Sequence, residues 1–358
     1  MKKNPFPAGR LLPCAAAIAA ALILLSACSA RQEKAAPGIA VFVPGIIEDS
    51  PVYDMLVQGV RAAVDAYNET ESAKDRAPVE LSVLEAGTNQ AEWGNKLTAL
   101  AASGKYGVIV SSNPSLPEIA APLTAQFPDQ RFIILDAFYE GNDRIATVRY
   151  NQREQAYLTG YIAALISAAP ASEMRFANAA RKIGFIAAQE YPVMNTILLP
   201  SFTEGAQAAV PGMEVDFRVV GNWYDASKGA ELAKALYKSG ADVVLPICGG
   251  ASQGVIAAAK ELGFYITWFD DNGFAKAPGY IVSSSVMAQK RMAQEVTAAY
   301  LDGTVEFGSA RTVGIEDGYI DFEQNDPQYV ETVSEPIRTR MAAVVDQIKS
   351  GALLLPSP

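Results

Sequence analysis

Histidine is absent from the 358-residue sequence, which excludes histidine-based catalytic triads, imidazole general bases and histidine-containing zinc sites. Cysteine is scarce, and Cys14, Cys28 and Cys248 do not make a disulfide framework. Basic residues are outnumbered, 29 against 39 acidic ones, so nucleic acid is not expected as a partner. Asp270 and Asp271 are adjacent, but no carboxylate cluster of suitable spacing surrounds them. We therefore expect no metal site.

The sequence also lacks an apolar run long enough for a permanent membrane span. The run from Leu11 to Leu25 has about 15 residues, whereas a spanning helix needs about 20. It follows three basic residues and ends in Leu-Ser-Ala-Cys, with Cys28 last. This pattern predicts a bacterial lipoprotein signal peptide over residues 1–27. A short uncleaved anchor is the alternative, and either reading places the rest of the chain outside the cytoplasm.

Cleavage makes Cys28 the lipidated N-terminus and leaves residues 28–37 as a tether. It also removes Lys2, Lys3 and Arg10, which takes the formal net charge from −10 to −13. Such an acidic chain has no basic patch with which to hold anionic lipid. The membrane attachment is therefore expected to come from the acyl chains of Cys28.

Short β-branched runs alternate with amphipathic helical stretches along the mature chain. In 51–67, for example, Leu56, Val60 and Val64 recur every four residues. Because buried strands that alternate with helices build parallel sheets, the pattern predicts an α/β fold of two doubly wound, Rossmann-like lobes joined by a hinge. The expected strands are 38–43, 79–84, 108–110, 131–135 and 145–148, then 182–187, 214–220, 242–247, 265–269 and 280–284.

The lobe boundary is expected near Tyr150, because an apolar helix from Gln152 to Ala168 begins the second unit. We expect residues 38–150 and 273–312 to form the N-terminal lobe. Residues 151–272 and 313–345 are expected to form the C-terminal lobe. The late return of the chain implies several hinge crossings.

Polar and aromatic residues follow most of the expected strands. In open parallel sheets ligands bind beyond the carboxyl ends of the strands, where helix N-termini converge. The mixture suits an uncharged ring that carries hydroxyl groups, because aromatic side chains stack on rings and carboxylates accept hydrogen bonds from hydroxyls. The candidates are Glu48, Asp49, Ser50, Tyr53, Ser112, Asn113 and Asp136, then Tyr191, Trp223, Gly249, Gly250 and Asp270.

Several of these residues have a purely structural alternative. Asp49 and Ser50 are suited to helix N-caps, and so is Asp225, which follows Trp223 by two residues. Trp223 can simply cover a lobe edge, and Gly249-Gly250 can serve a tight turn. Cys248, at the end of an apolar strand, is expected to be a small buried side chain rather than a nucleophile.

Longer motifs carry a resemblance to a known family. They are Glu48-Asp49, Asp136 after its strand, Arg149-Tyr150-Asn151-Gln152, Asp225-Ala226-Ser227-Lys228-Gly229 and Gly249-Gly250-Ala251-Ser252-Gln253. In these the chain resembles, over nearly its whole mature length, the basic membrane protein family of lipoproteins, which includes the purine nucleoside receptor. The resemblance implies a type I periplasmic binding protein fold, binding without catalysis, and an ABC permease and ATPase as partners. It points to Asp49, Asp136, Tyr191, Gly249 and Asp270 as ligand contacts and adds Tyr150 and Gln152 to the candidates.

One departure bears on the ligand. The family's sugar-binding lysine should follow a serine of the last strand by three residues, but 284–289 contains no lysine and Lys290 comes too late. The stretches 43–51 and 111–115 instead resemble the riboflavin-binding branch. Ribityl hydroxyls can be bound by Asp, Asn, Gln and Ser without a cation. We therefore favour riboflavin as transported ligand, with no cofactor, and place a purine nucleoside second.

Hinge closure of a monomer around the ligand is the expected mechanism. A sensor lipoprotein without a transport role is one alternative. A nucleoside hydrolase that uses the carboxylates of Asp49, Asp136 and Asp270 is another, which we rank below binding.

Overall fold

The computed structural model describes residue 1 and residues 38–72 and 77–357. The predicted signal peptide, Cys28 and the tether lie outside these residues, and so does the side chain of Asp49. The chain divides into two units, Met1–Ala36 and Pro37–Pro358, and every described helix and strand belongs to the second. Within the described residues, no helix is both long enough and apolar enough to cross a bilayer.

The first sheet has six strands in the order β11-β5-β4-β3-β1-β2, and every pairing is parallel. Neighbouring residues of a strand point to opposite faces, so Val41 and Phe42 join different buried clusters. The strands are β1 (Gly38–Val43), β2 (Leu81–Glu85), β3 (Tyr106–Ser112), β4 (Arg131–Leu135), β5 (Ile145–Tyr150) and β11 (Ala310–Val313).

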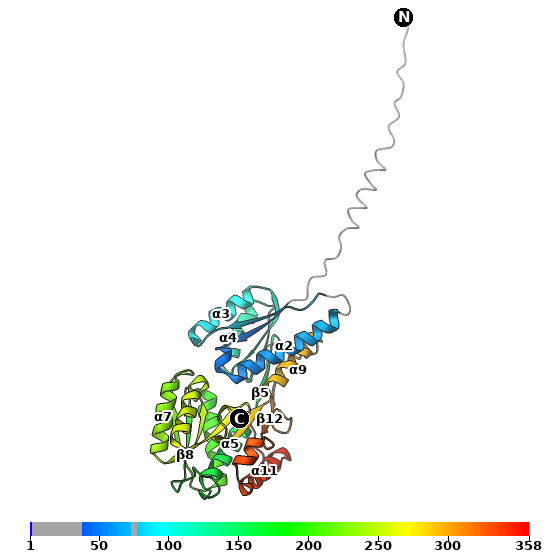
Figure 1. Ribbon diagram of the computed structural model, residues 1–358. Coiled ribbons are helices and arrows are strands. Elements are labelled where there is room, and N and C mark those ends of the chain that lie inside the picture. The colour runs from blue at the N-terminus through cyan, green and yellow to red at the C-terminus, as the bar shows by residue number, and fades with distance from the viewer. Residues whose placement is uncertain (2–37, 73–76, 358) are drawn as a thin grey trace. The chain divides into compact units, whose positions relative to one another are not determined.

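Helices cover both faces of this sheet (Figure 1). Trp93 of α3 (Gln90–Ala102) and Leu116 of α4 (Leu116–Gln126) are buried with Phe42 on one face. Leu56 of α2 (Pro51–Ser72) and Met292 of α9 (Gln289–Leu301) are buried in the cluster of the other face. We call this sheet and its four helices the first lobe.

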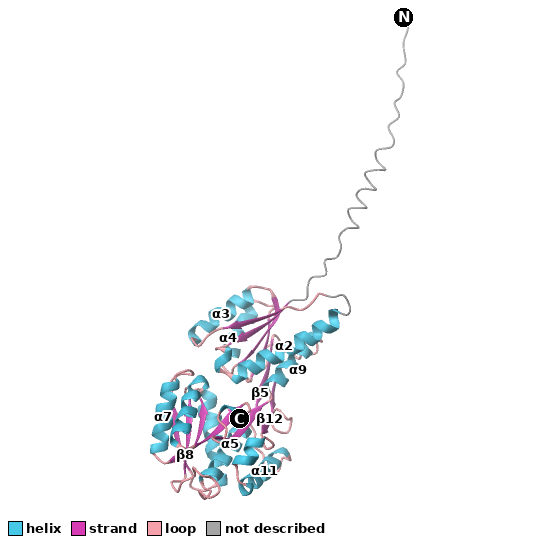
Figure 2. Ribbon diagram, viewed as in Figure 1, coloured by secondary structure: helices cyan, strands magenta, loops and turns pink. Residues whose placement is uncertain are grey.

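The second sheet also has six strands, in the order β12-β10-β9-β8-β6-β7, and only the pairing of β10 with β12 is antiparallel. The strands are β6 (Lys182–Ala187), β7 (Glu214–Val219), β8 (Ala241–Ile247), β9 (Tyr265–Asp270), β10 (Ile281–Met287) and β12 (Ile320–Phe322). Figure 2 shows the two sheets with helices on both sides of each. The predicted α/β class with two mainly parallel sheets is therefore confirmed.

The helices of the second sheet define the second lobe. They are α5 (Gln152–Ser167), α6 (Leu199–Ala209), α7 (Ala226–Lys238), α8 (Ser252–Leu262), α10 (Pro327–Thr332) and α11 (Glu335–Lys349), together with the short turns η2 (Met194–Leu198), η3 (Gly249–Ala251) and η4 (Phe274–Lys276). Helices α5 and α6 touch backbone to backbone, because a Cβ on Gly160 would lie 1.9 Å from the carbonyl oxygen of Phe202. Only glycine fits there.

One predicted boundary is wrong. The sequence predicts residues 273–312 in the N-terminal lobe, which corresponds to the first lobe, but β10 lies within this range and pairs with β9 and β12 of the second sheet. The chain changes lobes after β10 rather than before it, since α9 packs on α2 and β11 pairs with β5. Local sequence could not reveal this, because nothing in β10 itself specifies which of the two sheets it joins.

Three chain crossings, at 150–152, 287–289 and 313–320, link the lobes and are bonded to one another. The hydroxyl of Tyr150 donates to Oε1 of Gln289 over 2.6 Å. The amide of Asn151 donates to the carbonyl of Val313 over 2.7 Å, and that of Ile315 donates to Oε2 of Glu154 over 2.8 Å. The crossings therefore behave as one bonded hinge.

Candidate functional site

Two acidic residues end central strands of opposite lobes in an unusual backbone conformation. Asp136 follows β4 with φ of 54°, and Asp270 ends β9 with φ of 76°. Among the described non-glycine residues, Arg181 alone shares positive φ with them. The left-handed region costs a non-glycine residue roughly 1–2 kcal/mol, although aspartate tolerates it comparatively well. Both side chains thus leave their strands at the edge where the sequence predicts ligand binding.

Amide groups of one helix hold these two carboxyl groups. Nε2 of Gln152 donates to Oδ1 of Asp136 over 3.2 Å. Nε2 of Gln155 donates to Oδ1 of Asp270 over 3.3 Å and to the carbonyl oxygen of Ser285 over 3.0 Å. Both glutamines belong to the first turns of α5, directly after the first hinge crossing.

Burial dominates the electrostatics of the pair. It raises the pKa of Asp136 to about 8, with a further contribution from the negative charge of Asp270. It raises the pKa of Asp270 to about 7, with the charge of Asp271 adding to the effect and the bond from Gln155 opposing it. No ion pair neutralises either carboxyl among the described residues. The negative charge of Asp270 in the second lobe therefore affects the pKa of Asp136 in the first lobe.

Two phenols share this electrostatic environment. The hydroxyl of Tyr53, at the start of α2, donates to the carbonyl of Pro44 over 3.1 Å and accepts a long bond of 3.5 Å from Nδ2 of Asn113. Burial and then the charge of Asp136 raise the pKa of Tyr53 to about 12. Burial, followed by the charges of Asp136 and Asp270, raises the pKa of Tyr191 far above its usual range. Both phenols stay neutral.

An aromatic pair and a glutamine stand nearby on the second lobe. The rings of Tyr191 and Trp223 have centroids 6.2 Å apart at a tilt of 39°. Nε1 of Trp223 donates to Oε1 of Gln189 over 3.2 Å. The same oxygen accepts from Nε2 of Gln90, at the start of α3, over 3.4 Å. A hydrogen bond therefore connects the two lobes beside the aromatic pair.

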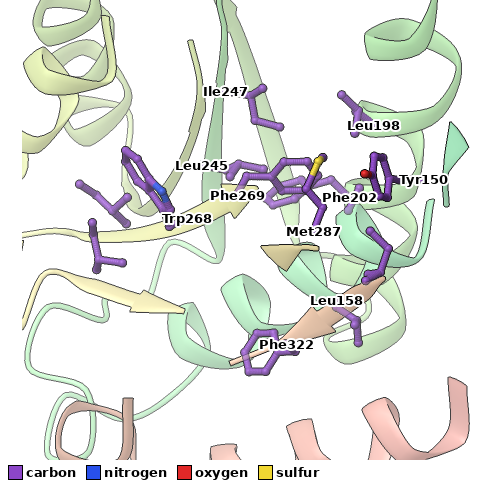
Figure 3. Close-up of a cluster of buried hydrophobic side chains, with 14 of the residues drawn as sticks. Tyr150, Leu158, Leu198, Phe202, Leu245, Ile247, Trp268, Phe269, Met287 and Phe322 are labelled. Carbon is purple, nitrogen blue, oxygen red and sulfur yellow. The ribbon is translucent and has the colours of Figure 1, made fainter. Parts of the chain in front are cut away.

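Other predicted site residues have structural roles or lie apart. Tyr150 is 1% exposed, and Figure 3 shows it among buried side chains that include Phe202 and Met287. Ser112 is buried at the end of β3, and Ser50 precedes α2, where its carbonyl oxygen accepts from the backbone amides of Tyr53 and Asp54. Glu48 is exposed, Gly249 starts the turn η3 with φ of 56°, and Gly250 lies within that turn.

The N-cap alternative holds for Asp225, whose Oδ1 accepts from the amide of Lys228 over 2.9 Å. Sequence reasoning missed Gln155 altogether. The available signal was its spacing of three residues from Gln152, which places both on adjacent positions of one helical face. Cys248 is buried as expected, with Sγ 3.3 Å from the hydroxyl oxygen of Ser252, and burial raises its pKa to about 12.

Two surface hollows, of about 230 and 580 Å³, do not include the paired carboxyl groups. The smaller is lined by residues of α5, η2 and α6 and is crossed by the ion pair of Arg153 with Glu204, whose atoms lie 3.0 Å apart. The larger lies at the end of α4 and the loop 139–144. Within the described residues, no group of three acidic or cysteine side chains is arranged to hold a metal ion.

Two lobes built on open α/β sheets, with ionisable groups that interact across the strand ends, have the fold of type I periplasmic binding proteins. The ABC transporter solute-binding protein of Aeropyrum pernix shares the fold, with a TM-score of 0.73 at 18% identity over 90% of this chain and 94% of that one. A transcriptional activator of the comK gene from Bacillus halodurans also shares it, with a TM-score of 0.65 at 20% identity over 88% and 99% of the two chains.

The chain belongs to the family of PnrA-like ABC transporter substrate-binding proteins, whose model matches residues 36–353. It is 23% identical to basic membrane protein A2 of Borrelia garinii over 333 residues, which cover 91% of each chain. It is also 23% identical to the ABC transporter nucleoside-binding protein BmpA of Lactococcus lactis, over 70% of this chain and 72% of that one. The family resemblance is thus confirmed, and the family is one of substrate-binding proteins rather than enzymes.

Proposed function

We infer that this chain is the lipid-anchored, extracytoplasmic binding component of an ABC importer and that its ligand is an uncharged ring compound with several hydroxyl groups. Riboflavin is the first candidate. The observation that carries the inference is the set of Asp136, Asp270, Tyr53 and Tyr191, which come from both lobes and feel one another's charge. Carboxyl and phenol groups exchange hydrogen bonds with ligand hydroxyls, and the ionised fraction of the carboxyl groups disfavours anions.

The stretch after Ser284 supports a ligand that needs no cation. Met287 is 3% exposed in the apolar core, and Gln289 is fully buried with its Oε1 engaged by Tyr150. Lys290 is exposed on α9, whose neighbouring turn packs against Gly59 of α2. A ribityl chain has hydroxyl groups on a flexible backbone, and aspartate and glutamine side chains can accept hydrogen bonds from them without a lysine. This favours riboflavin over a compact ribose.

A purine nucleoside is the second candidate, because the lactococcal relative is named as a nucleoside-binding protein. It too is an uncharged ring with hydroxyl groups, and Tyr191 and Trp223 offer aromatic surface to either ring. Stacking alone does not separate the two, since an aromatic pair adds only about 0.5–1.5 kcal/mol beyond burial.

The mechanism that fits these groups is ligand-driven closure. Contacts from both lobes form together only when the lobes approach, so a ligand that binds the closed form shifts the population toward it. The permease then recognises the closed form. A sensor lipoprotein would use the same cleft, and the absence of a permease and ATPase encoded beside the gene would favour that role.

The test begins with the protein as purified from cells. Retained riboflavin would show as yellow absorbance and quenched fluorescence, and calorimetric titration of stripped protein with riboflavin and guanosine ranks the candidates. A colourless protein that binds guanosine and ignores riboflavin would reverse the ranking. Binding of neither compound would refute the proposed ligand class.

Variants at the two ends of one strand localise the site. Asp136→Ala, after β4, is expected to weaken riboflavin binding at pH 9 about ten- to a hundredfold, because Asp136 is mainly ionised there and a hydrogen bond to a charged group contributes about 1.5–3 kcal/mol. Asp129→Ala is the matched control, since Asp129 is exposed and precedes the same strand. Asp270→Ala is expected to behave as Asp136→Ala does. Equal affinities for all three variants would remove the carboxyl groups from the site.

A further inference from the structure

The start of helix α5 contacts the carboxyl groups of both Asp136 and Asp270. Gln152 donates to Asp136 of the first lobe, over 3.2 Å, and Gln155 donates to Asp270 of the second, over 3.3 Å. The two glutamines are three residues apart and therefore neighbours on one face of the helix. A single rigid element thus holds one acidic group from each side of the cleft.

We propose that Gln152 and Gln155 are positioning residues, which orient the carboxyl groups of Asp136 and Asp270 through neutral amide donors and couple the one in the first lobe to the hinge. The proposal rests on the proposed function, because it assigns these carboxyl groups to the ligand. It adds that the ligand meets carboxyl groups that neutral amides orient without a cation, so each can donate or accept a hydrogen bond according to its protonation.

Gln155 is locked in place. Its side chain is fully buried, and its second amide hydrogen reaches the carbonyl of Ser285 over 3.0 Å. Its Oε1 has no hydrogen-bond partner among the described protein atoms. A buried acceptor without a partner carries a desolvation penalty, so stability alone does not explain the residue. A role in orienting Asp270 does.

The link to the hinge comes from the same helical turn. Asn151, the N-cap residue of α5, donates its backbone amide to Val313 of the third crossing, and Glu154 accepts from Ile315 of that crossing. Gln155 stays with its own lobe, whereas Gln152 reaches across to the other. Rotation about the hinge therefore acts on the bond of Gln152 to Asp136, whereas the bond of Gln155 to Asp270 stays within one lobe.

Among the described residues, the negative groups that act on the pair oppose its ionisation, and the charge of Asp271 is partly offset by Lys276, whose Nζ lies 3.2 Å from Oδ2 of Asp271. Asp136 faces Asp270 of the other lobe, Tyr53 of α2, Tyr150 of β5 and Tyr191. Asp270 faces Asp271 on its own loop as well as Asp136 and Tyr191. The hydrogen bond from Gln155 lowers the pKa of Asp270 against these effects. Loss of an amide donor should consequently raise the pKa of the carboxyl that it holds.

The first experiment needs no ligand. The carboxyl carbons of the aspartates are labelled with ¹³C, and the pKa of Asp136 and of Asp270 is measured by NMR in the full chain. Gln155→Met is expected to raise the pKa of Asp270 more than that of Asp136, and Gln152→Met is expected to do the reverse. Thr159→Val is the matched control, because Thr159 is buried one turn after Gln155 and donates to Oγ of Ser285 over 2.8 Å.

The control separates positioning from packing. Thr159→Val loses a buried hydrogen bond on the same face of α5 without touching a carboxyl, so both pKa values should stay as in the native chain. The proposal is overturned if both glutamine variants leave the two values unchanged, or if Thr159→Val shifts them as much. Gln152 is only partly buried, so Gln152→Met still tests the idea if Gln155→Met does not fold.

The second experiment measures riboflavin affinity against pH. Ligand hydroxyls favour the ionised carboxyl, so Gln155→Met should weaken binding most at pH 6.5 and progressively less toward pH 9. A rise of one unit in the pKa of Asp270 corresponds to about a tenfold loss at the acid end. A loss that is equal at every pH would indicate a structural role and overturn the proposal. If the native chain binds neither riboflavin nor guanosine, the proposed function fails, while the NMR arm still decides the positioning role.

Discussion

The C-terminal tail offers a sharp test of what holds the hinge together. The matched family region ends at residue 353, yet Leu355 beyond it is only 4% exposed and belongs to the main buried cluster. Its carbonyl oxygen accepts from Nδ2 of Asn151 over 2.8 Å, and that of Pro356 accepts from Arg153 over 3.3 Å. The tail therefore packs against the first hinge crossing.

We expect Leu355→Ala to lower the free energy of unfolding by about 2–3 kcal/mol. Buried leucine-to-alanine changes lose roughly 2–5 kcal/mol, and the lower part of that range applies because a tail can relax toward the space left behind. The backbone bonds to Asn151 and Arg153 do not involve the leucine side chain. The substitution thus isolates the contribution of apolar burial.

Leu354→Ala is the matched control, because the neighbouring Leu354 is 76% exposed. It should change the unfolding free energy by less than about 0.5 kcal/mol. Urea unfolding followed by tryptophan fluorescence measures both variants, with Trp93 reporting on the first lobe and Trp268 on the second. No loss for Leu355→Ala would show that the tail does not contribute to the fold, and equal losses for the two leucines would contradict burial as the cause.

Three further outcomes follow from the same contacts. Gly160→Ala should destabilise the protein by at least about 1–3 kcal/mol in urea unfolding, because the new Cβ would lie 1.9 Å from the carbonyl oxygen of Phe202. Gly94→Ala is the control and should be neutral or stabilising, because the nearest atom to its Cβ would be 3.8 Å away. Burial raises the pKa of Asp242 from its ordinary value of 3.8 to about 6, so the folded state binds more protons than the unfolded state. The stability that this group contributes at acid pH is therefore lost as the pH rises through about 6. Asp242→Asn should flatten this fall in unfolding free energy, measured between pH 4 and 7. Equilibrium dialysis at pH 9, where both carboxyl groups are mainly ionised, should find flavin mononucleotide bound at least about tenfold more weakly than riboflavin, because Asp136 and Asp270 repel its phosphate. Equal binding at that pH would contradict a site without a compensating cation.

Strand and helix content follow from local pattern. Buried parallel strands are apolar along their whole length, so runs such as 38–43 and 182–187 are recognisable and coincide with β1 and β6. The ends of these strands are predictable too, because each apolar run stops where the strand stops. Asp136 and Asp270 could be named as candidates from position alone, although nothing local showed that their charges interact across the lobes.

Longer-range choices were beyond local pattern. The sequence identified Asp225 equally as a ligand contact and as a cap, and the bond to Lys228 decides for the cap. Tyr150 looked like a cleft residue, but its ring is buried and its hydroxyl is bonded to Gln289 at the second crossing. Both outcomes depend on a partner whose location the residue's own neighbours do not specify.

The sequence by itself determined the α/β class, the two lobes and the edges at which acidic and aromatic side chains emerge, because apolar periodicity and strand length are local properties. Tertiary structure alone decided that β10 joins the second sheet, that Gln155 holds Asp270 and that the tail at Leu355 packs on the hinge. Each of these depends on contacts between segments far apart in the chain, and such contacts are selected by the packing of the whole fold.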